Sequence, residues 1–179
     1  MISRNNSAQL LSRNKPTNQS SLLDNERLSS LANDGSYNQN PYIKVNGRND
    51  CTHTKNESTN YWLVNLEEEY YIYYIVLYNR GDMHIDRLIS AKIDIIRSNG
   101  RTKTVGQIKE NRLQFNISIS DHLSGQFVKI ILENNYLTLC EVDVYGGKFT
   151  LFTFTLHYIK LFVIIILNYY KNFHCTIFH

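Results

Sequence analysis

His53, Arg80 and Arg87 follow a spacing that can bind a polar ligand. The pattern is H-x26-R-x-D-x4-R, in which Asp82 supplies the carboxylate. Two guanidinium groups are rigid, permanently charged hydrogen-bond donors, and an imidazole ring adds a donor or an acceptor. Taken singly, Arg-Gly-Asp is usually a solvated turn, and a lone histidine is usually an ordinary loop residue. The interpretation therefore depends on the joint spacing.

No catalytic motif accompanies these residues. The sequence contains neither a Gly-x-Ser-x-Gly nucleophile elbow nor a His-Glu-x-x-His zinc motif. Asp82 and Asp86 lie four positions apart in an expected loop, which is too little to propose a pair of glycosidase carboxylates. We therefore expect a binding protein and not an enzyme.

Short β-strands are expected to position the polar residues, because apolar and polar residues alternate over short runs. The expected strands cover 61–66, 70–78, 91–97, 112–119, 126–132 and 137–145. Turns are predicted at Ser98-Asn99-Gly100 and at Ser124-Gly125. No apolar stripe of helical period and helix length occurs before residue 150. Short antiparallel strands with turns between them favour a β-sandwich or a barrel.

Length, charge and cysteine usage limit the class of protein. The chain has 179 residues, which suits one domain of ordinary size with short tails. Its formal net charge is +3, and the 19 Lys and Arg are scattered among 16 Asp and Glu, so we expect no nucleic-acid partner. The three cysteines form no Cys-x-x-Cys pair, which argues against a zinc ribbon or a thioredoxin-like motif.

The two ends of the chain differ from its middle. Residues 1–6 are expected to be disordered and contain no apolar signal-peptide segment. After Gly147 the sequence is strongly apolar, but only 161–167 run without a polar interruption, whereas a spanning helix needs about 20 apolar residues. We interpret 148–179 as an unassigned apolar tail, disordered or artefactual. The alternative is weak membrane association, and we do not expect a membrane anchor.

The order of the motifs resembles the F-type lectins, or fucolectins, over residues 7–147. The resemblance is carried by the His-Arg-Arg pattern, by CTHT at 51–54 and by LTLCEVDVYGG at 137–147. It implies an all-β domain, a jelly-roll β-sandwich of the galactose-binding or discoidin-like type. It also implies a secreted lectin, of the kind used in innate immunity, that recognises terminal L-fucose on glycans or glycoproteins.

By this resemblance, His53, Arg80 and Arg87 are the sugar-binding residues. Guanidinium forks match the fixed lone pairs of sugar hydroxyl and ring oxygens, and the histidine can hydrogen-bond a further hydroxyl. Asp82 is then expected to orient one of the arginines. Tyr42 is a further residue that could stack on the sugar.

The chain departs from the family next to this pattern. Many members carry two adjacent cysteines after the Arg-x-Asp, and Met83 and His84 stand at those positions here. Met83 can supply an apolar contact in their place, because a thioether adapts to irregular surfaces. His84 can add a hydrogen bond to the pocket wall or point to solvent.

The resemblance also implies a disulfide between Cys51 and Cys140 and a structural calcium ion. Two reduced, buried cysteines are the alternative if the chain is cytosolic. Calcium takes six to eight oxygen ligands, which backbone carbonyls and carboxylates can supply. The positions that match the metal ligands are Leu31, Asp34, Ser36, Asp50, Cys140 and Glu141.

The alternative function keeps the discoidin-like fold and changes the ligand. Another sugar, a phospholipid head group or a receptor protein could then be bound. Membrane-binding relatives usually present apolar loop tips, whereas the loops here are rich in asparagine, which favours a sugar. Trp62 is expected in the core and not in the site. The sequence leaves open whether the chain forms a homo-oligomer.

Overall fold

The computed structural model describes residues 8–42, 49–120 and 123–148, together with Phe162. The chain divides into two units, Met1–Lys148 and Phe149–His179. The second unit is described only at Phe162, so the expected apolar tail lies outside the described residues, as do residues 1–6. Within the described part of the chain, no helix has the length and apolarity to cross a membrane.

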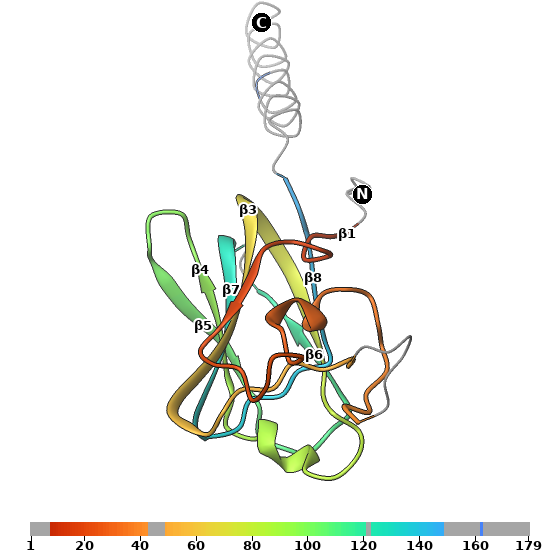
Figure 1. Ribbon diagram of the computed structural model, residues 1–179. Coiled ribbons are helices and arrows are strands. Elements are labelled where there is room, and N and C mark those ends of the chain that lie inside the picture. Colours follow the sequence, from red (N-terminus) through yellow and green to blue (C-terminus); the bar gives the residue numbers. More distant parts are fainter. Residues whose placement is uncertain (1–7, 43–48, 121–122, 149–161, 163–179) are drawn as a thin grey trace, which may run out of the picture. The chain divides into compact units, whose positions relative to one another are not determined.

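The described residues of the first unit form strands and two short 3-10 helices (Figure 1). In chain order these are β1 (Gln9–Leu10), β2 (Thr17–Gln19), η1 (Ser29–Ala32), β3 (Glu57–Tyr78), η2 (Ile85–Leu88), β4 (Lys92–Ile96), β5 (Thr102–Gln107), β6 (Gln114–Ser118), β7 (Ser124–Asn135) and β8 (Glu141–Gly147). The predicted all-β class is therefore confirmed.

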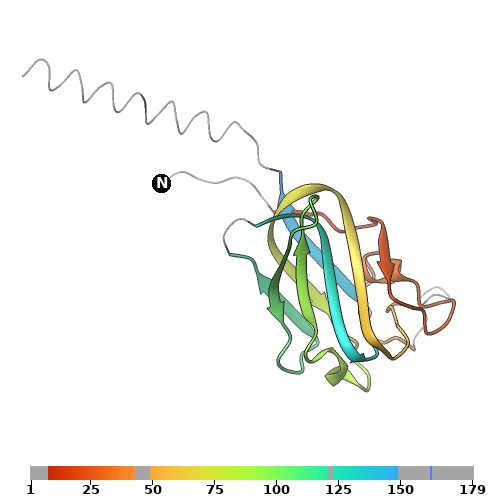
Figure 2. The same ribbon diagram turned by 90° about the vertical axis from the view of Figure 1, so that its left-hand side faces the viewer.

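The long strand β3 belongs to both layers of a jelly-roll sandwich. Its first part pairs with β2 and β7, and its second part pairs with β6 and β8, in each case antiparallel. The register with β7 shifts between Asn65 and Tyr70, and Glu67 between them has a left-handed φ of 70°. β4 and β5 extend the first layer, and β1 extends the second. Figure 2 shows β3 arching over one end of the sandwich.

Three details of the strand prediction were wrong. The segments 61–66 and 70–78 are one strand, because the exposed glutamates between them do not interrupt the extended chain. Ser124-Gly125 is not a turn but the start of β7, where a Cβ on Gly125 would lie 2.3 Å from Ile95 Cγ2, so the glycine permits close packing. β5 was missed, because its mostly polar sequence gives little apolar alternation.

The core lies between the two layers and contains the alternating apolar residues of the strands. Trp62, Val64 and Leu66 of β3 are fully buried. Trp62 Nε1 donates a hydrogen bond to the carbonyl of Ser29 at 2.8 Å, so the polar end of this ring is satisfied inside the protein. The prediction that Trp62 is a core residue is confirmed.

Both ends of β3 reach the same end of the sandwich, opposite the bend. Glu57, at its start, pairs with Asn135 at the end of β7, and Tyr78, at its end, pairs with Glu141 at the start of β8. The segments that precede β3, follow β3 and connect β7 to β8 therefore meet there. These segments carry the predicted functional residues.

Candidate functional site

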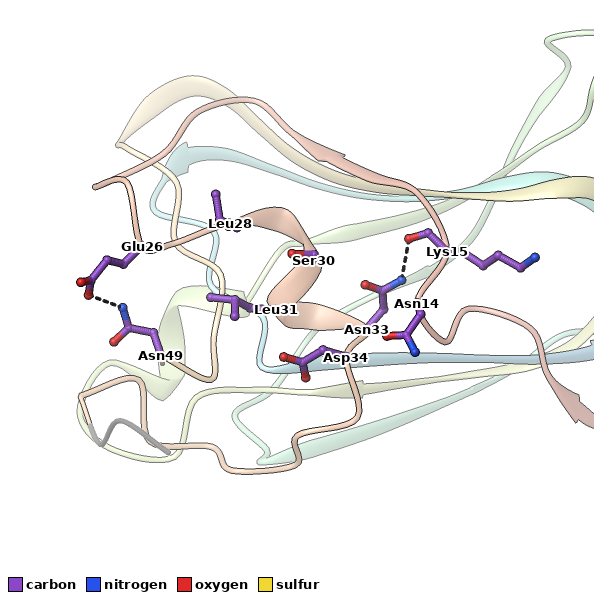
Figure 3. A pocket seen from close by; sticks show the side chains of 9 residues that line it. All are labelled: Asn14, Lys15, Glu26, Leu28, Ser30, Leu31, Asn33, Asp34 and Asn49. Carbon is purple, nitrogen blue, oxygen red and sulfur yellow. Dashed lines mark hydrogen bonds between the residues drawn. The ribbon is translucent and has the colours of Figure 1, made fainter. Parts of the chain in front are cut away.

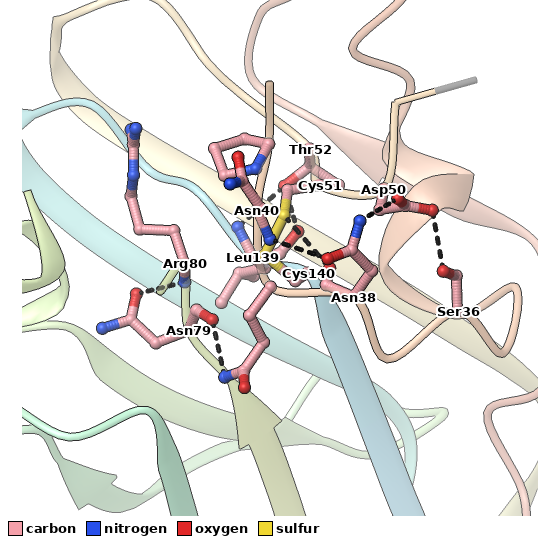
Figure 4. The surroundings of a disulfide bond; sticks show 12 residues. Ser36, Asn38, Asn40, Asp50, Cys51, Thr52, Asn79, Arg80, Leu139 and Cys140 are labelled. Atoms are coloured by element: carbon pink, nitrogen blue, oxygen red, sulfur yellow. Dashed lines mark hydrogen bonds between the residues drawn. A yellow bond between two sulfur atoms is a disulfide. The ribbon is translucent and has the colours of Figure 1, made fainter. Parts of the chain in front are cut away.

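The segment that carries His53 is tied to the connection before β8. The amide of Thr52 donates to the carbonyl of Leu139 at 2.8 Å, and the Thr52 hydroxyl accepts from the amide of Leu139 at 3.1 Å. A disulfide joins Cys51 to Cys140 next to this pairing (Figure 4), which confirms the predicted bridge. After His53, the amide of Thr54 donates to the carbonyl of Leu137 at 3.0 Å, so the backbone is fixed on both sides of His53, whose side chain is buried.

The protonation state of His53 follows from its surroundings. Its Nδ1 lies 2.8 Å from the carbonyl of Thr54, and since a carbonyl only accepts, Nδ1 carries the proton and Nε2 presents a lone pair. Burial lowers the pKa of the ring, the Thr54 bond opposes this, and the guanidiniums of Arg80, Arg87 and Arg27 lower the pKa further. His53 is therefore a neutral hydrogen-bond acceptor at neutral pH.

Arg80 is fully buried and is held by Asp82. Its Nε and Nη2 donate to the two carboxylate oxygens of Asp82 at 2.8 and 2.7 Å. Burial acts to lower the pKa of Arg80, but the Asp82 carboxylate and the nearby Tyr42 phenol raise it overall, and the bond to Arg80 lowers the pKa of Asp82. Nη1 is buried and has no hydrogen-bond partner among the described residues. One nitrogen of this charged group is thus buried and unpaired in the described structure, next to the Tyr42 ring.

Arg87, on η2, completes the group. Its Nη1 lies 3.5 Å from Nε2 of His53, and its guanidinium carbon lies 4.7 Å from the centre of the Tyr136 ring. The same ring meets His53 edge-on, with centroids 5.4 Å apart. The structure therefore brings His53, Arg80 and Arg87 to one place.

Side-chain amides fix the turn between β3 and η2. The Oδ1 of Asn79 accepts from the amide of Arg80 at 2.9 Å, and its Nδ2 donates to the carbonyl of Ile85 at 2.8 Å. The amide of Gly81 donates to the carbonyl of Gln39 at 2.6 Å. This turn is therefore anchored to its own continuation and to the loop before β3.

Met83, His84 and Tyr42, which were also predicted near the sugar, are exposed. Met83 is 69% exposed, and His84 is also exposed with a left-handed φ of 65°. Tyr42 is 68% exposed, and its ring centre lies 5.7 Å from the guanidinium carbon of Arg80. All three side chains are accessible to solvent, and of these Tyr42 has a described contact with a buried donor.

Sequence reasoning missed two residues of this site, Tyr136 and Arg27. The Tyr136 ring packs against the guanidinium of Arg87. The guanidinium carbon of Arg27 lies 5.9 Å from the centre of the Tyr42 ring. Neither belongs to the spacing pattern that singled out the other residues. Only the position of Tyr136 directly before the LTLCEV motif could have pointed to it.

A cavity of about 540 Å³ lies along η1 and is separate from this site (Figure 3). It is lined by Asn14, Lys15, Glu26, Leu28, Ser30, Leu31, Asn33, Asp34 and Asn49. Leu31 and Asp34 belong to the predicted calcium ligands, whereas the His-Arg-Arg residues are not part of the lining.

The predicted calcium ligands gather partly around Glu141. Its buried carboxylate accepts from the amide of Gly35 at 3.2 Å, and Arg13 Nη2 lies 3.4 Å away. Ser36 Oγ donates to Asp50 Oδ1 at 2.7 Å. Leu31 is buried on η1, the Asp34 carboxylate accepts from the amide of Ser36, and Cys140 is in the disulfide.

The carboxyl groups of this region affect one another electrostatically. Burial raises the pKa of Glu141 to about 8; Arg13 opposes the rise, and the Asp143 and Asp34 carboxylates add to it. Asp143 Oδ1 is also buried without a hydrogen-bond partner in the described structure. The described residues hold no cluster of three or more His, Cys, Asp or Glu placed for a metal, so carbonyl and hydroxyl oxygens would have to contribute.

Comparisons with known proteins agree with this fold. The family model for the NedA-like, galactose-binding domain, of the F5/F8 type C group, matches residues 31–130. A fucose-binding module from Streptococcus pneumoniae superposes with a TM-score of 0.67 at 31% identity, over 78% of this chain and 99% of the module. A fucolectin from striped bass (Morone saxatilis) serum gives 0.66 at 26%, over 79% of this chain and 48% of that one.

Fucolectin-6 of the eel Anguilla japonica is 34% identical over 99 residues, which are 52% of this chain and 53% of the eel protein. The match thus spans about half the length of that relative. The chain belongs to the family of the NedA-like, galactose-binding domain. Within this class, the fucolectin relatives and the structural neighbours identify it as an F-type lectin domain, which confirms the resemblance.

Proposed function

We propose that this domain binds terminal L-fucose on glycans through His53, Arg80 and Arg87. The observation that carries the proposal is the buried Nη1 of Arg80, a charged donor without a described hydrogen-bond partner, near the neutral acceptor of His53. A sugar hydroxyl both donates and accepts, so one hydroxyl can accept from an arginine and donate to Nε2. Relatives described as fucolectins and fucose-binding modules support this choice of sugar.

Met83 provides the apolar part of the proposed site. Fucose carries a methyl group where most hexoses carry a hydroxymethyl group, so an apolar wall favours it. Met83 is exposed at the rim, and the half-exposed Leu113 lies 3.5 Å from the position that a Cβ on Gly81 would take. In this proposal Met83 replaces the paired cysteines of many F-type lectins.

A structural calcium ion is the second part of the proposal. The carbonyls of Leu31, Ser36 and Cys140 and the side-chain oxygens of Asp34, Asp50 and Glu141 would hold it. The ion would neutralise carboxylates that are close together and buried, and so stabilise the loops on both sides of the disulfide. The raised pKa of Glu141 supports this assignment, because that carboxyl is short of positive charge.

We further propose that the domain binds without catalysis, in an extracellular setting. The Cys51–Cys140 disulfide supports an oxidising compartment, since such bridges are rare in the cytosol. Clustering of several copies would add avidity for a branched glycan, and the structure identifies no interface for it.

A glycan array with fucosylated and matched non-fucosylated probes tests the function. We expect binding only to the fucosylated probes, and loss of retention on fucose resin for Arg87→Ala. Arg101→Ala is the control, because Arg101 is exposed in the β4–β5 turn. Equal binding of both probe sets, or binding to phospholipid vesicles in their place, would refute the proposal.

A further inference from the structure

Arg27 is a third guanidinium at the proposed sugar site. Its guanidinium carbon lies 5.9 Å from the centre of the Tyr42 ring, and that of Arg80 lies 5.7 Å from the same ring. It is also one of the three cations that lower the pKa of His53. Arg27 therefore acts on the same space as the His-Arg-Arg residues, although it is outside their sequence pattern.

The Arg27 side chain is fixed in position, but its positive charge is only partly neutralised by its surroundings. It is 6% exposed, and Nη1 donates to the carbonyl of Pro41 at 2.7 Å. Its Nε is buried without a hydrogen-bond partner among the described residues, and the carboxylate of Asp24, half exposed, lies 3.8 Å away. A carboxylate at that distance makes an ion pair but no hydrogen bond. Arg27 is thus a positively charged side chain in a fixed position, and it could interact with a further anion.

The proposed sugar site carries more positive than negative charge. Three guanidiniums lie near the site, against two carboxylates: Asp82 accepts two hydrogen bonds from Arg80, and Asp24 lies 3.8 Å from Arg27 Nε. A fucose residue is neutral, so it satisfies donors without balancing charge. Buried cations favour a partner of opposite charge, and guanidinium forks match groups that present two oxygens.

We propose that Arg27 selects fucosylated glycans that carry an anionic group, a sulfate or a carboxylate, on the sugar next to the fucose. This inference rests on the proposed fucose binding. Sulfate and carboxylate share the chemistry that Arg27 recognises, and the probes below separate them. The feature that would attract this group is the charge of Arg27, which the single ion pair with Asp24 across 3.8 Å balances only in part.

Four probes test the proposal on the whole chain. These are a neutral fucosylated trisaccharide, the same glycan with a sulfate, the same glycan with a sialic acid carboxylate, and the sulfated glycan without fucose. We expect one of the two acidic fucosylated probes to bind about tenfold more tightly than the neutral one at low salt. Raising the salt to about 1 M should reduce this ratio strongly, because screening acts on the charged contact.

Variants assign the effect to Arg27. In Arg27→Gln the ratio of acidic to neutral affinity should fall to about one, and Arg27→Lys should keep part of it, since lysine retains the charge and loses the fork. Arg101→Gln is the matched control and should keep the full ratio. A variant that only destabilises the loops would weaken binding of the acidic and neutral probes equally and leave the ratio of their affinities unchanged. The salt series tests the charged contact on the wild-type protein.

The outcomes are distinguishable. Equal affinity of the wild type for neutral and acidic fucosylated probes would overturn this inference and leave fucose binding intact. A ratio that survives in Arg27→Gln, or equal binding of the sulfated glycan without fucose, would also overturn it. No binding of any fucosylated probe would overturn both this inference and the proposed function.

Discussion

Two polar regions of opposite charge flank the Cys51–Cys140 disulfide, and Figure 4 shows Arg80 on one side and Asp50 on the other. The first is cationic and contains the guanidiniums of Arg80 and its neighbours. The second is acidic and contains the buried carboxylates of Glu141 and Asp143. Both regions bury charge, but they respond to burial differently.

The difference lies in whether the buried group can lose its charge. An arginine stays charged, so the cationic region keeps donors that need acceptors, and Asp82 satisfies only part of them. A carboxyl can take up a proton, and the pKa of Glu141 is accordingly raised to about 8. The arginines of the cationic region therefore remain hydrogen-bond donors over the whole pH range, and the acidic region is suited to binding protons or a metal ion.

Removing the disulfide should affect both regions and have the largest effect. The bridge closes a loop with a sequence separation of 89, for which chain entropy gives about 4–5 kcal/mol of stability. We expect the Cys51→Ser, Cys140→Ser double variant to lose about this much in urea unfolding. The reduced wild type should match it. An unchanged midpoint in both would show that backbone pairing alone holds the two regions.

Breaking the cationic region should abolish sugar binding. Arg80→Ala leaves the Asp82 carboxylate without its partner, so we expect loss of fucose affinity by at least about 100-fold, or ~3 kcal/mol. Arg80→Lys should restore the charge but not the two-pronged bond, and remain clearly weakened. Titration calorimetry with fucose measures both. Wild-type affinity in Arg80→Ala would remove Arg80 from the site.

Removing calcium should act mainly through the acidic region. At calcium 100-fold above its Kd, binding adds about 2.7 kcal/mol, so a chelator should lower the melting temperature by several degrees. The shift should shrink in Glu141→Gln. A melting curve that ignores both calcium and chelator would contradict the proposed metal site.

The pH dependence without calcium gives a second view of the acidic region. The pKa of Glu141 is about 8 in the folded protein, against an ordinary value of 4.5, so between these values the unfolded chain is ionised while the folded one holds a proton. The folded state binds more protons there, so its stability should fall as the pH rises from about 5 to 8. Glu141→Gln should flatten this slope in chelator. A slope unchanged by the substitution would assign it to other groups.

His53 gives the cationic region a pH dependence of opposite sign. Its pKa in the folded protein lies below the ordinary 6.5, so the stability it contributes is present above 6.5 and is lost as the pH falls. Protonation also removes the Nε2 acceptor. We expect fucose affinity to decrease once the pH falls below the pKa of the folded protein, by up to about tenfold per pH unit. His53→Gln should bind weakly with a flat profile, and a pH-independent wild type would contradict the neutral-acceptor role.

The rim should give the smallest effect. Met83→Ala removes an exposed apolar contact, for which we expect about a two- to threefold loss of fucose affinity and no change in stability. Comparison with L-galactose, which has a hydroxymethyl group in place of the methyl, sharpens the test, because the variant should lose selectivity between the two. Unchanged selectivity would contradict the proposal that Met83 contacts the methyl group of fucose.

The sequence predicted the residues that follow a fixed spacing. The His-Arg-Arg pattern and the CTHT and LTLCEV motifs led to residues that the fold brings together, because these motifs end or begin strands at one end of the sandwich. Trp62 was placed correctly in the core by its apolar neighbours. Motifs and spacings of this kind can be recognised in a single sequence.

Contacts made by residues outside a recognisable sequence pattern could not be predicted. Arg27 reaches the site through the loop before η1, and Tyr136 through its position under Arg87. Glu141 and Asp143 are charged residues that alternate with apolar ones in β8, yet both are fully buried. Their burial depends on Arg13 and Tyr37, more than 100 positions away in the chain, and no local pattern records that packing.

The shared strand β3 also has a consequence for folding kinetics. Because it pairs in both layers, the site end closes only after contacts between distant parts of the chain have formed, and such topologies fold slowly. The segments that carry the proposed sugar site should assemble late, in the same cooperative step as the core. A bound sugar should then slow unfolding of the whole domain. The amide of Ile72, which donates to the carbonyl of Leu123 beyond the bend of β3, would then report occupancy of a site at the other end of the sandwich by its exchange with solvent deuterium.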